Sequence, residues 1–402
     1  MTDEVLYIDA GQAAAELGVA VTTLYAYVGR KNIRSQKVPG SRQRRYWKPD
    51  IDRVKAGLAI GARGVSVGIN QETDITLVTP SGPYFRGRSA IELSDTYTLE
   101  QTASLLWQVD ETVAFASVRT EAPDELRQLG SVLEHATSTD KAIALLPFLE
   151  HASPRAFDLS HLGMCRTGAA VMRWYAAILT GADTPSAQPL HEQIACAVKA
   201  SPEITELIRR LLVLSADHGF GAGTYAVRAV ASTGVSPYRS VLAGLAIVTG
   251  RRSKFGRNEG ISRLLLEVSE ASDPKAIIVR RLREGEDLPG FDSPRPYVNG
   301  DPRATLLLSA LEKIFGEDRD LKNIAAAIEI VDELQGLKPS FALVNSLLSR
   351  KIGLDRRQSL YILGRCAGWV AHSIEQYQAG EIEGAESNYV GFLPDSNQAA
   401  SR

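Results

Sequence analysis

The stretch HEQIACAVKASPEITELIRRLLVLSADHG, residues 191–219, decides the fold class of this chain. Its apolar residues recur at the three- and four-residue spacing of an amphipathic helix. The same spacing returns in TLEQTASLLWQV, ELRQLGSVLEHA and DLKNIAAAIEIVDELQGL, which are residues 98–109, 125–136 and 320–337. We therefore predict a mainly α-helical body from about residue 99 onward.

Just before this helical region, the stretch TDITLVTPSGPYFRGRSAIEL, residues 73–93, alternates apolar residues around turn residues. Alternation of this kind is typical of strands, so we expect a short β-hairpin region there. The Gly/Ala-rich residues 55–64 are expected to join it to a separate N-terminal segment.

The N-terminal segment differs from the body in charge. Residues 1–55 carry ten Lys/Arg and six Asp/Glu, whereas the whole chain has a net charge of −2. We expect Asp9 to cap a first helix, Gly18 to end it and Thr22 to cap a second helix. KVPGSRQRRYW, residues 37–47, then predicts a small β-wing that turns at Pro39-Gly40.

Two helices joined by a glycine turn and followed by a basic wing resemble the winged helix-turn-helix of excisionase-like and mercury-regulator-like proteins. The resemblance implies that the segment binds DNA. The predicted groove contacts are Thr22, Thr23, Tyr25 and Arg30, and the predicted phosphate contacts are Arg42, Arg44 and Arg45. A small docking domain with a merely solvated basic face is the alternative.

Bulk properties limit the class of protein. With 44% hydrophobic and 23% charged residues, the 402-residue chain has an ordinary globular composition. Its cysteines, Cys165, Cys196 and Cys366, have no metal-ligand spacing. The N-terminus MTDEVLYIDAG lacks an apolar signal core, and no apolar run approaches the roughly 18 residues of a membrane span. These features predict a cytoplasmic protein without a metal site or a membrane partner.

Ordered motifs give the body a more specific likeness. They are FRGRSAIEL (85–93), LLW (105–107), ADHGFGAGTYAVRAVASTG (216–234), LPGFDSPRPYVNGDPRATLLL (288–308), GRCAGWVAHSIEQ (364–376) and NYVG (388–391). In this order they resemble the citrate synthase family over about residues 65–391. The basic head lies outside the resemblance.

The resemblance implies a fold and a reaction. The expected fold is a citrate synthase-like, two-domain helical subunit that works as a homodimer. The predicted domains are a winged helix-turn-helix at 1–57, a large domain at 65–221 and 326–395, and a small domain at 222–325. The family condenses an acyl-CoA, usually acetyl-CoA, with oxaloacetate or a related 2-oxoacid. It implies acyl-CoA as substrate or ligand, and no permanently bound cofactor.

Part of the family's substrate-binding set has matches in this chain. His218 matches its first substrate-binding histidine, and Arg303 and Arg365 match two carboxylate-binding arginines. Arginine suits that role because its planar fork meets a carboxylate in a bidentate way.

The catalytic positions are substituted. Lys254 and Ser293 stand where the family has histidines, and Ser340 stands where it has the aspartate base. Glu386 falls where an arginine crosses to the partner subunit. Serine has no useful basicity near neutral pH, and a charged lysine cannot act as a neutral donor. His372, in the motif GWVAHSIEQ, is interpreted as a packing or hydrogen-bonded histidine.

The loop around Lys254 also contains Arg251, Arg252 and Arg257. These cations suit CoA phosphates or another polyanion, with a solvated basic loop as the alternative. Three functions stay open from sequence. They are a metabolite-binding, DNA-associated regulator that has lost synthase activity, an active acyltransferase with altered chemistry or substrate, and an accessory subunit that pairs with a complete paralogue.

Overall fold

The computed structural model describes residues 7–30, 33–38, 40–41, 43–48, 50–51, 54–55, 72–116, 132–250, 258–292, 296–354 and 359–380. The chain divides into two compact units, Met1–Glu72 and Thr73–Arg402. Each unit has its own cluster of buried hydrophobic side chains. We call the first unit the head and the second the body.

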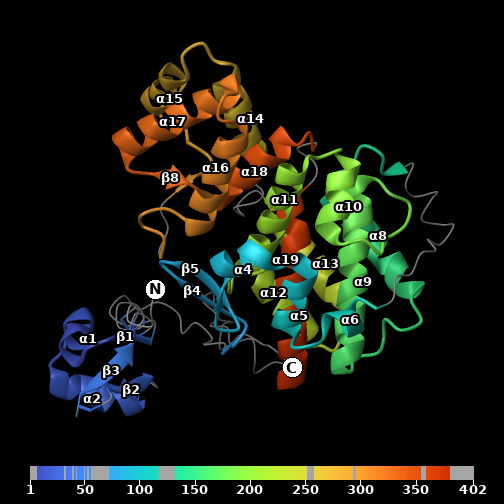
Figure 1. Ribbon diagram of the computed structural model, residues 1–402. Coiled ribbons are helices and arrows are strands. Elements are labelled where there is room, and N and C mark those ends of the chain that lie inside the picture. The colour runs from blue at the N-terminus through green and yellow to red at the C-terminus, as the bar shows by residue number, and fades with distance from the viewer. Residues whose placement is uncertain are drawn as a thin grey trace, which may run out of the picture. The chain divides into compact units, whose positions relative to one another are not determined.

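The described residues of the head include the helices α1 and α2 and a three-stranded antiparallel sheet (Figure 1), and residues 48, 50–51 and 54–55 are also helical. Its elements are β1 (Tyr7–Ile8), α1 (Ala10–Leu17), α2 (Val21–Arg30), β2 (Ser35–Lys37) and β3 (Arg44–Trp47), with sheet order β1-β3-β2. The strands β2 and β3 pair from Ser35 with Tyr46 to Lys37 with Arg44. The helix pair and the hairpin that the sequence predicts are therefore present, although Pro39 lies outside the described residues.

The helix ends in the head test three predicted caps. Asp9 accepts a hydrogen bond from the backbone of Gln12 and forms a capping box with it, and Gly18 ends α1 at a φ of 66°. Both predictions are confirmed. The prediction for Thr22 is wrong, because α2 already begins at Val21. The carbonyl of Ala20 accepts the first helical hydrogen bonds, from the amides of Thr23 and Leu24.

The body begins with a second antiparallel sheet, which confirms the predicted hairpin region. It consists of β4 (Thr76–Thr79), β5 (Gly82–Phe85) and β6 (Arg88–Ser89) in that order. Just before β4, Thr73 Oγ1 and the Asp74 amide both donate to Glu375 Oε1 at 3.1 Å. The start of the body is thus tied to its last described helix.

The rest of the described body is mainly helical, as predicted. Its helices are α4 (Ala90–Thr96), α5 (Leu99–Trp107), α6 (Glu111–Ala114), α8 (Ser138–His151), α9 (His161–Thr180), α10 (Leu190–Ala197), α11 (Pro202–Ser215), α12 (Ala222–Ala231), α13 (Pro237–Val248), α14 (Asn258–Glu270), α15 (Pro274–Arg283), α16 (Pro302–Phe315), α17 (Arg319–Gln335), α18 (Phe341–Lys351) and α19 (Leu360–Ala379). The short strands β7 (Phe291–Asp292) and β8 (Lys338–Pro339) pair antiparallel.

The stretch 191–219 contributes two of these helices, α10 and α11. They are separate because Ser201 caps α11 and Pro202 occupies its first turn, where a missing amide donor costs nothing. The greater part of the predicted helix at 125–136 lies outside the described residues.

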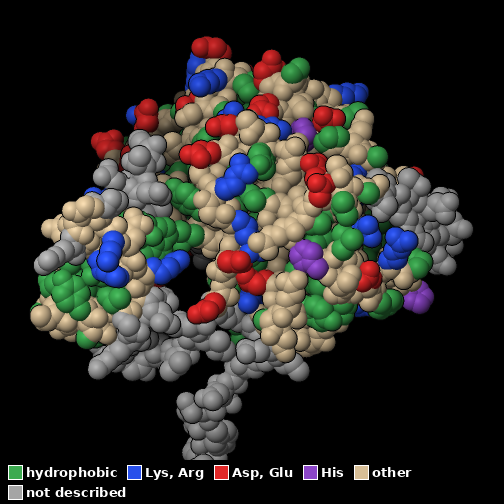
Figure 2. All heavy atoms as spheres, turned by 60° about the horizontal axis from the view of Figure 1, so that its bottom comes forward, with side chains coloured by type: hydrophobic (Ala, Val, Ile, Leu, Met, Phe, Trp, Pro, Cys, Tyr) green, Lys and Arg blue, Asp and Glu red, His purple; other side chains and the backbone are tan. Residues whose placement is uncertain are grey.

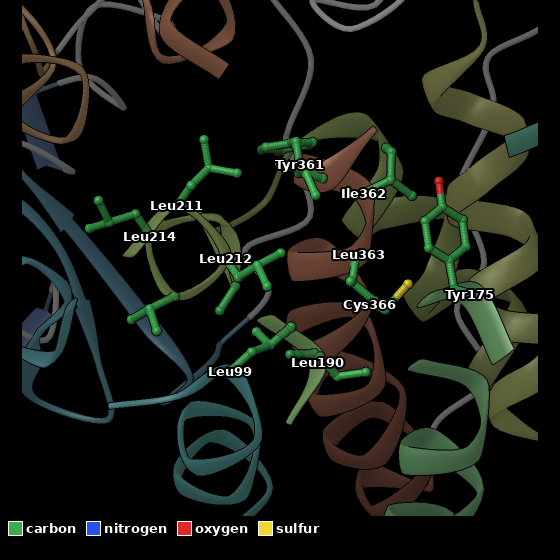
Figure 3. Close-up of a cluster of buried hydrophobic side chains, with 14 of the residues drawn as sticks. Leu99, Tyr175, Leu190, Leu211, Leu212, Leu214, Tyr361, Ile362, Leu363 and Cys366 are labelled. Carbon is green, nitrogen blue, oxygen red and sulfur yellow. The ribbon is translucent and has the colours of Figure 1, made fainter. Parts of the chain in front are cut away.

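The helix α19 is the centre of the body. Side chains from α9, α11 and α19 converge in one apolar cluster, in which Tyr175, Leu212 and Cys366 take part (Figure 3). The backbones of α19 and the segment after α11 approach so closely that the Gly368 amide donates to the Ala216 carbonyl at 2.9 Å. From α5, Trp107 Nε1 donates to the Ala367 carbonyl at 2.8 Å.

Packing between helices bears on the predicted domain boundaries. The helices α14, α15 and α17 pack on one another, and α16 packs on both α11 and α18 (Figure 1). The helices α12 and α13, which fall inside the predicted small domain at 222–325, pack against α19. The two compact units separate only the head from the body, so the division of the body stays a prediction.

The surface carries charges of both signs. On the face drawn in Figure 2, the Lys/Arg and Asp/Glu side chains of the body are interspersed. In the part of the chain that the structure describes, every helix is too short or too polar to span a lipid bilayer.

Candidate functional site

A cleft of about 660 Å³ in the body brings together three of the predicted site residues, His218, Arg303 and Ser340. They come from three separate places, namely the loop after α11, the first turn of α16 and the residue before α18. Tyr297 and Tyr361 also line the cleft. Its walls therefore combine imidazole, guanidinium and phenol groups with apolar surface.

Arg303 is the described arginine that lines this cleft. Its Nε and Nη2 donate to the two carboxylate oxygens of Asp301 at 3.0 and 2.7 Å. Its guanidinium lies 4.3 Å from the ring centroid of Phe341, and Nη1 donates to the Leu214 carbonyl. Asp301 also caps α16 by accepting from the Arg303 amide. The cation is thus held in one orientation by its own helix cap.

The pair also sets the charge state of Asp301. Burial alone would raise the pKa of this carboxyl, but the hydrogen bonds and the charge of Arg303 hold it below its ordinary value. The site therefore contains a permanent ion pair at neutral pH. An anionic ligand that approaches Arg303 meets a guanidinium whose charge is partly offset.

His218 is neutral at physiological pH. Burial, with a smaller contribution from the charge of the nearby Arg303, lowers the pKa of its imidazole to about 3. Its Nε2 lies 2.9 Å from the hydroxyl of Tyr297. A neutral imidazole both donates and accepts hydrogen bonds, so this side chain can stabilise an oxygen-bearing ligand without carrying charge.

Ser340 has a structural task as well as a place in the cleft. Its hydroxyl accepts from the Leu343 amide at 3.3 Å and caps α18. Its own amide donates to the Gly290 carbonyl at 2.8 Å. The residue that the sequence motifs predict at the position of the family's base is therefore a helix cap without a carboxylate.

Arg365 does not line the described cleft. Its Nη1 donates to Asp217 Oδ1 at 2.6 Å, and Nη2 donates to Thr224 Oγ1 at 2.9 Å. Burial would raise the pKa of Asp217, but Arg365 and His372 hold it below its ordinary value. The predicted role of Arg365 in carboxylate binding stays a prediction.

His372 lies fully buried beside this ion pair. Its Nε2 is 3.4 Å from Asp217 Oδ2, and its ring meets that of Phe220 edge to face at 5.3 Å. This agrees with the interpretation of His372 as a packed, hydrogen-bonded histidine.

Several predicted residues fall outside the described part of the chain. They are Arg42, Arg251, Arg252, Lys254, Arg257, Ser293 and Glu386. The side chain of Arg30, at the end of α2, is also not described. Their predicted roles therefore stay predictions.

In the head, the remaining predicted DNA contacts occupy two elements. Thr22 and Tyr25 are exposed on α2, with Thr23 half-buried between them, and Arg44 and Arg45 lie on β3. The side chain of Tyr25 is 56% exposed, which is unusual for an aromatic residue on a short helix.

Among the described residues of the head, three other basic side chains are engaged in ion pairs. Arg34 forms a bidentate pair with Asp50, and Lys48 and Lys55 both pair with Glu16. The charge available for phosphate contact is therefore smaller than the sequence count suggests.

Sequence reasoning missed the residues that surround the predicted ones. Tyr297, Asp301 and Phe341 hold or contact His218 and Arg303, yet none was a predicted site residue. For Asp301 a signal was present, because an aspartate two residues before an arginine at a helix start can cap and pair at once. Tyr297 lies 79 residues from His218 in sequence, so no local pattern joins them.

The fold and the cleft define a mainly helical protein with a carboxylate-paired arginine and a neutral histidine in one cavity. A family model described as the citrate synthase C-terminal domain matches residues 61–384. The chain belongs to the citrate synthase family.

Curated relatives agree with this assignment. The chain is 28% identical to citrate synthase 2 of Bacillus subtilis over 209 residues, which are 50% of this chain and 56% of the relative. It is similarly 29% identical to a citrate synthase of Haloferax volcanii, of which it covers 51%. The chain thus spans about half the length of these relatives. With 2-methylcitrate synthase of Mycobacterium tuberculosis it shares 24% identity over 86% of this chain and 91% of that protein.

Solved structures show the same fold. Citrate synthase from Thermotoga maritima superposes with a TM-score of 0.65 at 23% identity, covering 84% of this chain and 98% of that chain. Citrate synthase from Thermoplasma acidophilum, solved with carboxymethyl coenzyme A and oxaloacetate, gives a TM-score of 0.66 at 17% identity, with coverage of 84% and 99%. At these identities the likeness concerns the fold.

Proposed function

We propose that this protein binds a 2-oxoacid in the cleft of its body, does not perform the family's condensation efficiently, and acts as a DNA-associated regulator. The single observation that carries the proposal is Ser340. It lines the cleft and its hydroxyl caps a helix, and the sequence motifs predict that it stands in place of the family's base. A serine hydroxyl cannot take a proton from a thioester methyl near neutral pH without a base of its own.

Two side chains in the cleft support binding of a 2-oxoacid. Arg303 presents a pre-oriented cation, and His218 presents a neutral hydrogen-bonding group in the same cavity. A 2-oxoacid offers both a carboxylate and a ketone oxygen to such a pair. Acyl-CoA remains a candidate second ligand on the strength of the family.

The first experiment measures catalysis and binding on the same sample. Release of CoA thiol from acetyl-CoA and oxaloacetate is followed beside an authentic citrate synthase, and oxaloacetate binding is measured by calorimetry. We expect measurable binding and a rate at least about 10²-fold below the authentic enzyme, because loss of one acid–base group typically costs 10²–10⁴. Turnover at a comparable rate would overturn the proposal.

Ser340→Asp and Ser340→Ala make a matched pair for this site. Aspartate and serine are similarly good helix caps, whereas alanine is not. We expect Ser340→Asp to fold normally and still give little CoA release, because the positions that match the family's histidines, Lys254 and Ser293, are also substituted. Restoration of full activity by this one change would show that the other substitutions are harmless.

The regulatory half assigns DNA binding to the head and ligand binding to the body. Support comes from the exposed Tyr25 and Thr22 on α2 and from the basic strand β3. A homodimer would present two heads, and two linked heads bind one duplex more tightly than either head alone. Selection from a random duplex library, followed by titration with and without oxaloacetate, tests this directly.

The DNA test has a clear internal control. We expect Arg44→Ala to weaken binding to all duplexes and to lower the slope of log affinity against log salt by about one. Lys322→Ala, which removes an exposed lysine of the body, should leave both quantities unchanged. An affinity that is insensitive to Arg44 and to oxaloacetate would contradict the regulatory role.

An active acyltransferase with altered substrate is the second candidate. It is favoured by the carboxylates of Asp287, which precedes β7, and Asp292, which lies in β7, because both residues also line the cleft and offer alternative bases. The curated relatives are named as synthases, which agrees with this candidate. Steady-state CoA release across a panel of acyl-CoAs and 2-oxoacids would establish it, and silence across the panel would eliminate it.

A further inference from the structure

Tyr297 is a buried phenol in the cleft without an assigned role. Its side chain is only 3% exposed, yet it lines the cavity and its hydroxyl lies 2.9 Å from His218 Nε2. The ring lies 6.0 Å from the guanidinium carbon of Arg303. Tyr297 therefore sits between the histidine and the arginine that match the family's substrate-binding residues.

The hydrogen bond between Tyr297 and His218 can run in either direction, depending on which group carries the shared proton. Burial raises the pKa of the Tyr297 hydroxyl, and burial lowers that of the His218 imidazole, so both groups are neutral at pH 7. The pair holds one phenol proton and one imidazole proton. Either Tyr297 donates to Nε2, or Nε2–H donates to the phenol oxygen and leaves the phenol proton available to a third group.

A bound ketone favours the arrangement in which His218 Nε2–H donates to the phenol oxygen of Tyr297. A ketone oxygen only accepts hydrogen bonds, so it gains most from a phenol proton that is not already used. Arg303 already donates two N–H groups to Asp301 and a third to the Leu214 carbonyl, and its remaining donors suit the carboxylate of the ligand. Because the position that matches the family's second histidine is Ser293, a different polarising group is needed here.

We propose that the Tyr297 hydroxyl, oriented by His218, donates a hydrogen bond to the ketone oxygen of a 2-oxoacid bound in the cleft. This assignment rests on the proposed function, since it concerns the same cavity and ligand class. Tyr297 would be the residue that distinguishes a 2-oxoacid from the corresponding saturated dicarboxylate. The hydroxyl polarises a carbonyl in the way that preorganised donors stabilise oxyanions.

The test compares two ligands that differ only at the ketone. Calorimetry with the full-length protein gives the dissociation constants of oxaloacetate and succinate, and their ratio measures recognition of the ketone. We expect the wild type to prefer oxaloacetate and Tyr297→Phe to reduce this preference about tenfold, the size expected for one lost hydrogen bond. Succinate affinity should change by less than about twofold.

Tyr175→Phe is the matched control, because Tyr175 is also a fully buried phenol with a raised pKa and lies on α9 away from the cleft. It should leave the preference unchanged. An unaltered preference in Tyr297→Phe would overturn the proposal, and so would an equal loss for both ligands, which indicates a merely structural role.

A second measurement does not depend on the variant. In wild-type protein with ¹⁵N-labelled histidine, oxaloacetate should shift the His218 ring nitrogens toward a protonated Nε2, and succinate should not. Identical spectra with the two ligands would overturn the assignment. Failure of the wild type to bind either ligand would overturn the proposed function and this inference together, whereas binding without ketone preference overturns the inference alone.

Discussion

At the scale of single residues, burial in the cleft determines the charge state of His218. The same burial that places it in the cleft removes the water that would stabilise its charged form, so burial lowers the pKa of the imidazole to about 3. Arg303 acts in the same direction. The residue is therefore a permanent neutral hydrogen-bonding group across the physiological pH range.

This has a consequence for stability. Below about pH 6.5 the unfolded chain protonates His218, while the folded protein keeps it neutral down to about pH 3. Its contribution to the free energy of unfolding is therefore complete above pH 6.5 and is lost as pH falls toward 3. We expect His218→Gln to flatten the pH dependence of stability between pH 6.5 and 4.5, by up to about 1.4 kcal/mol per pH unit.

Urea unfolding of the wild type and His218→Gln at several pH values measures this slope. The His151→Gln change serves as the control, because His151 is exposed at the end of α8. Parallel pH profiles for wild type and His218→Gln would show that the imidazole titrates normally in the folded protein.

The pair of Asp301 and Arg303 gives a second prediction at this scale. Both side chains are at least nine-tenths buried, and Asp301→Asn would leave the guanidinium without its charge partner. Breaking a buried pair by removing one partner costs about 3–5 kcal/mol. Glu317→Gln removes the partner of an exposed lysine, Lys322, and should have a much smaller effect on the free energy of unfolding, because solvent screens this pair. Chemical unfolding of both variants tests the contrast, and equal effects would contradict it.

At the scale of elements, local rules account for much of the fold. Helical spacing predicted the helical body, and alternation of apolar residues predicted the strands β4 and β5. Cap chemistry predicted the roles of Asp9 and Gly18 at the two ends of α1. Thr22 failed as a cap because the choice among Ala20, Val21 and Thr22 is set by backbone geometry after the turn, and side-chain type alone does not fix it. The packing of α12 and α13 on α19 involves partners more than a hundred residues away, which no local pattern reveals.

Contacts between elements also limit substitution. A Cβ atom at Gly368 on α19 would lie 2.3 Å from the Ala216 carbonyl oxygen and 2.4 Å from Asp217 Oδ1. We expect Gly368→Ala to lower the free energy of unfolding by about 1–3 kcal/mol, because the two segments must separate. Gly223→Ala on α12 should be tolerated, since its Cβ would lie 3.5 Å from Trp369, an ordinary contact. Thermal unfolding that ranks the two variants in the opposite order would contradict the close approach.

At the scale of the whole molecule, two separate hydrophobic clusters imply two separate unfolding events. The head has the smaller cluster, and small cores give marginal stability. Leu24 lies at its centre with no exposure. We expect Leu24→Ala to lower only one of two calorimetric transitions, with a loss of about 2–5 kcal/mol in the head.

A truncated protein that starts at Thr73 provides the control. It should show the transition that Leu24→Ala leaves unchanged, and it should retain oxaloacetate binding. A single cooperative transition in the full chain, shifted as a whole by Leu24→Ala, would mean that the two units unfold together.

The candidate site is a property of this larger scale. Motifs indicated His218 and Arg303 because each stands in a recognisable local sequence. The engagement of Arg365 by Asp217, 148 residues away, and the contact of Tyr297 with His218 depend on how distant segments meet. The sequence therefore predicted which residue types lie in the site better than it predicted which of them are available to a ligand.

The central place of α19 has a consequence for how the protein is made. The first strand of the body is tied through Thr73 to Glu375, 302 residues later, and α5 is tied through Trp107 to Ala367. A ribosome adds about 5–20 residues per second, so these early segments wait many seconds for their partner helix. The described core residues of the head pack only against residues of the same unit, so the head can fold as soon as its 72 residues are made. During synthesis, the nascent chain therefore carries a folded head while the apolar faces of the body's helices remain exposed to solvent. We expect chaperones to bind the nascent chain mainly between synthesis of α5 and synthesis of α19.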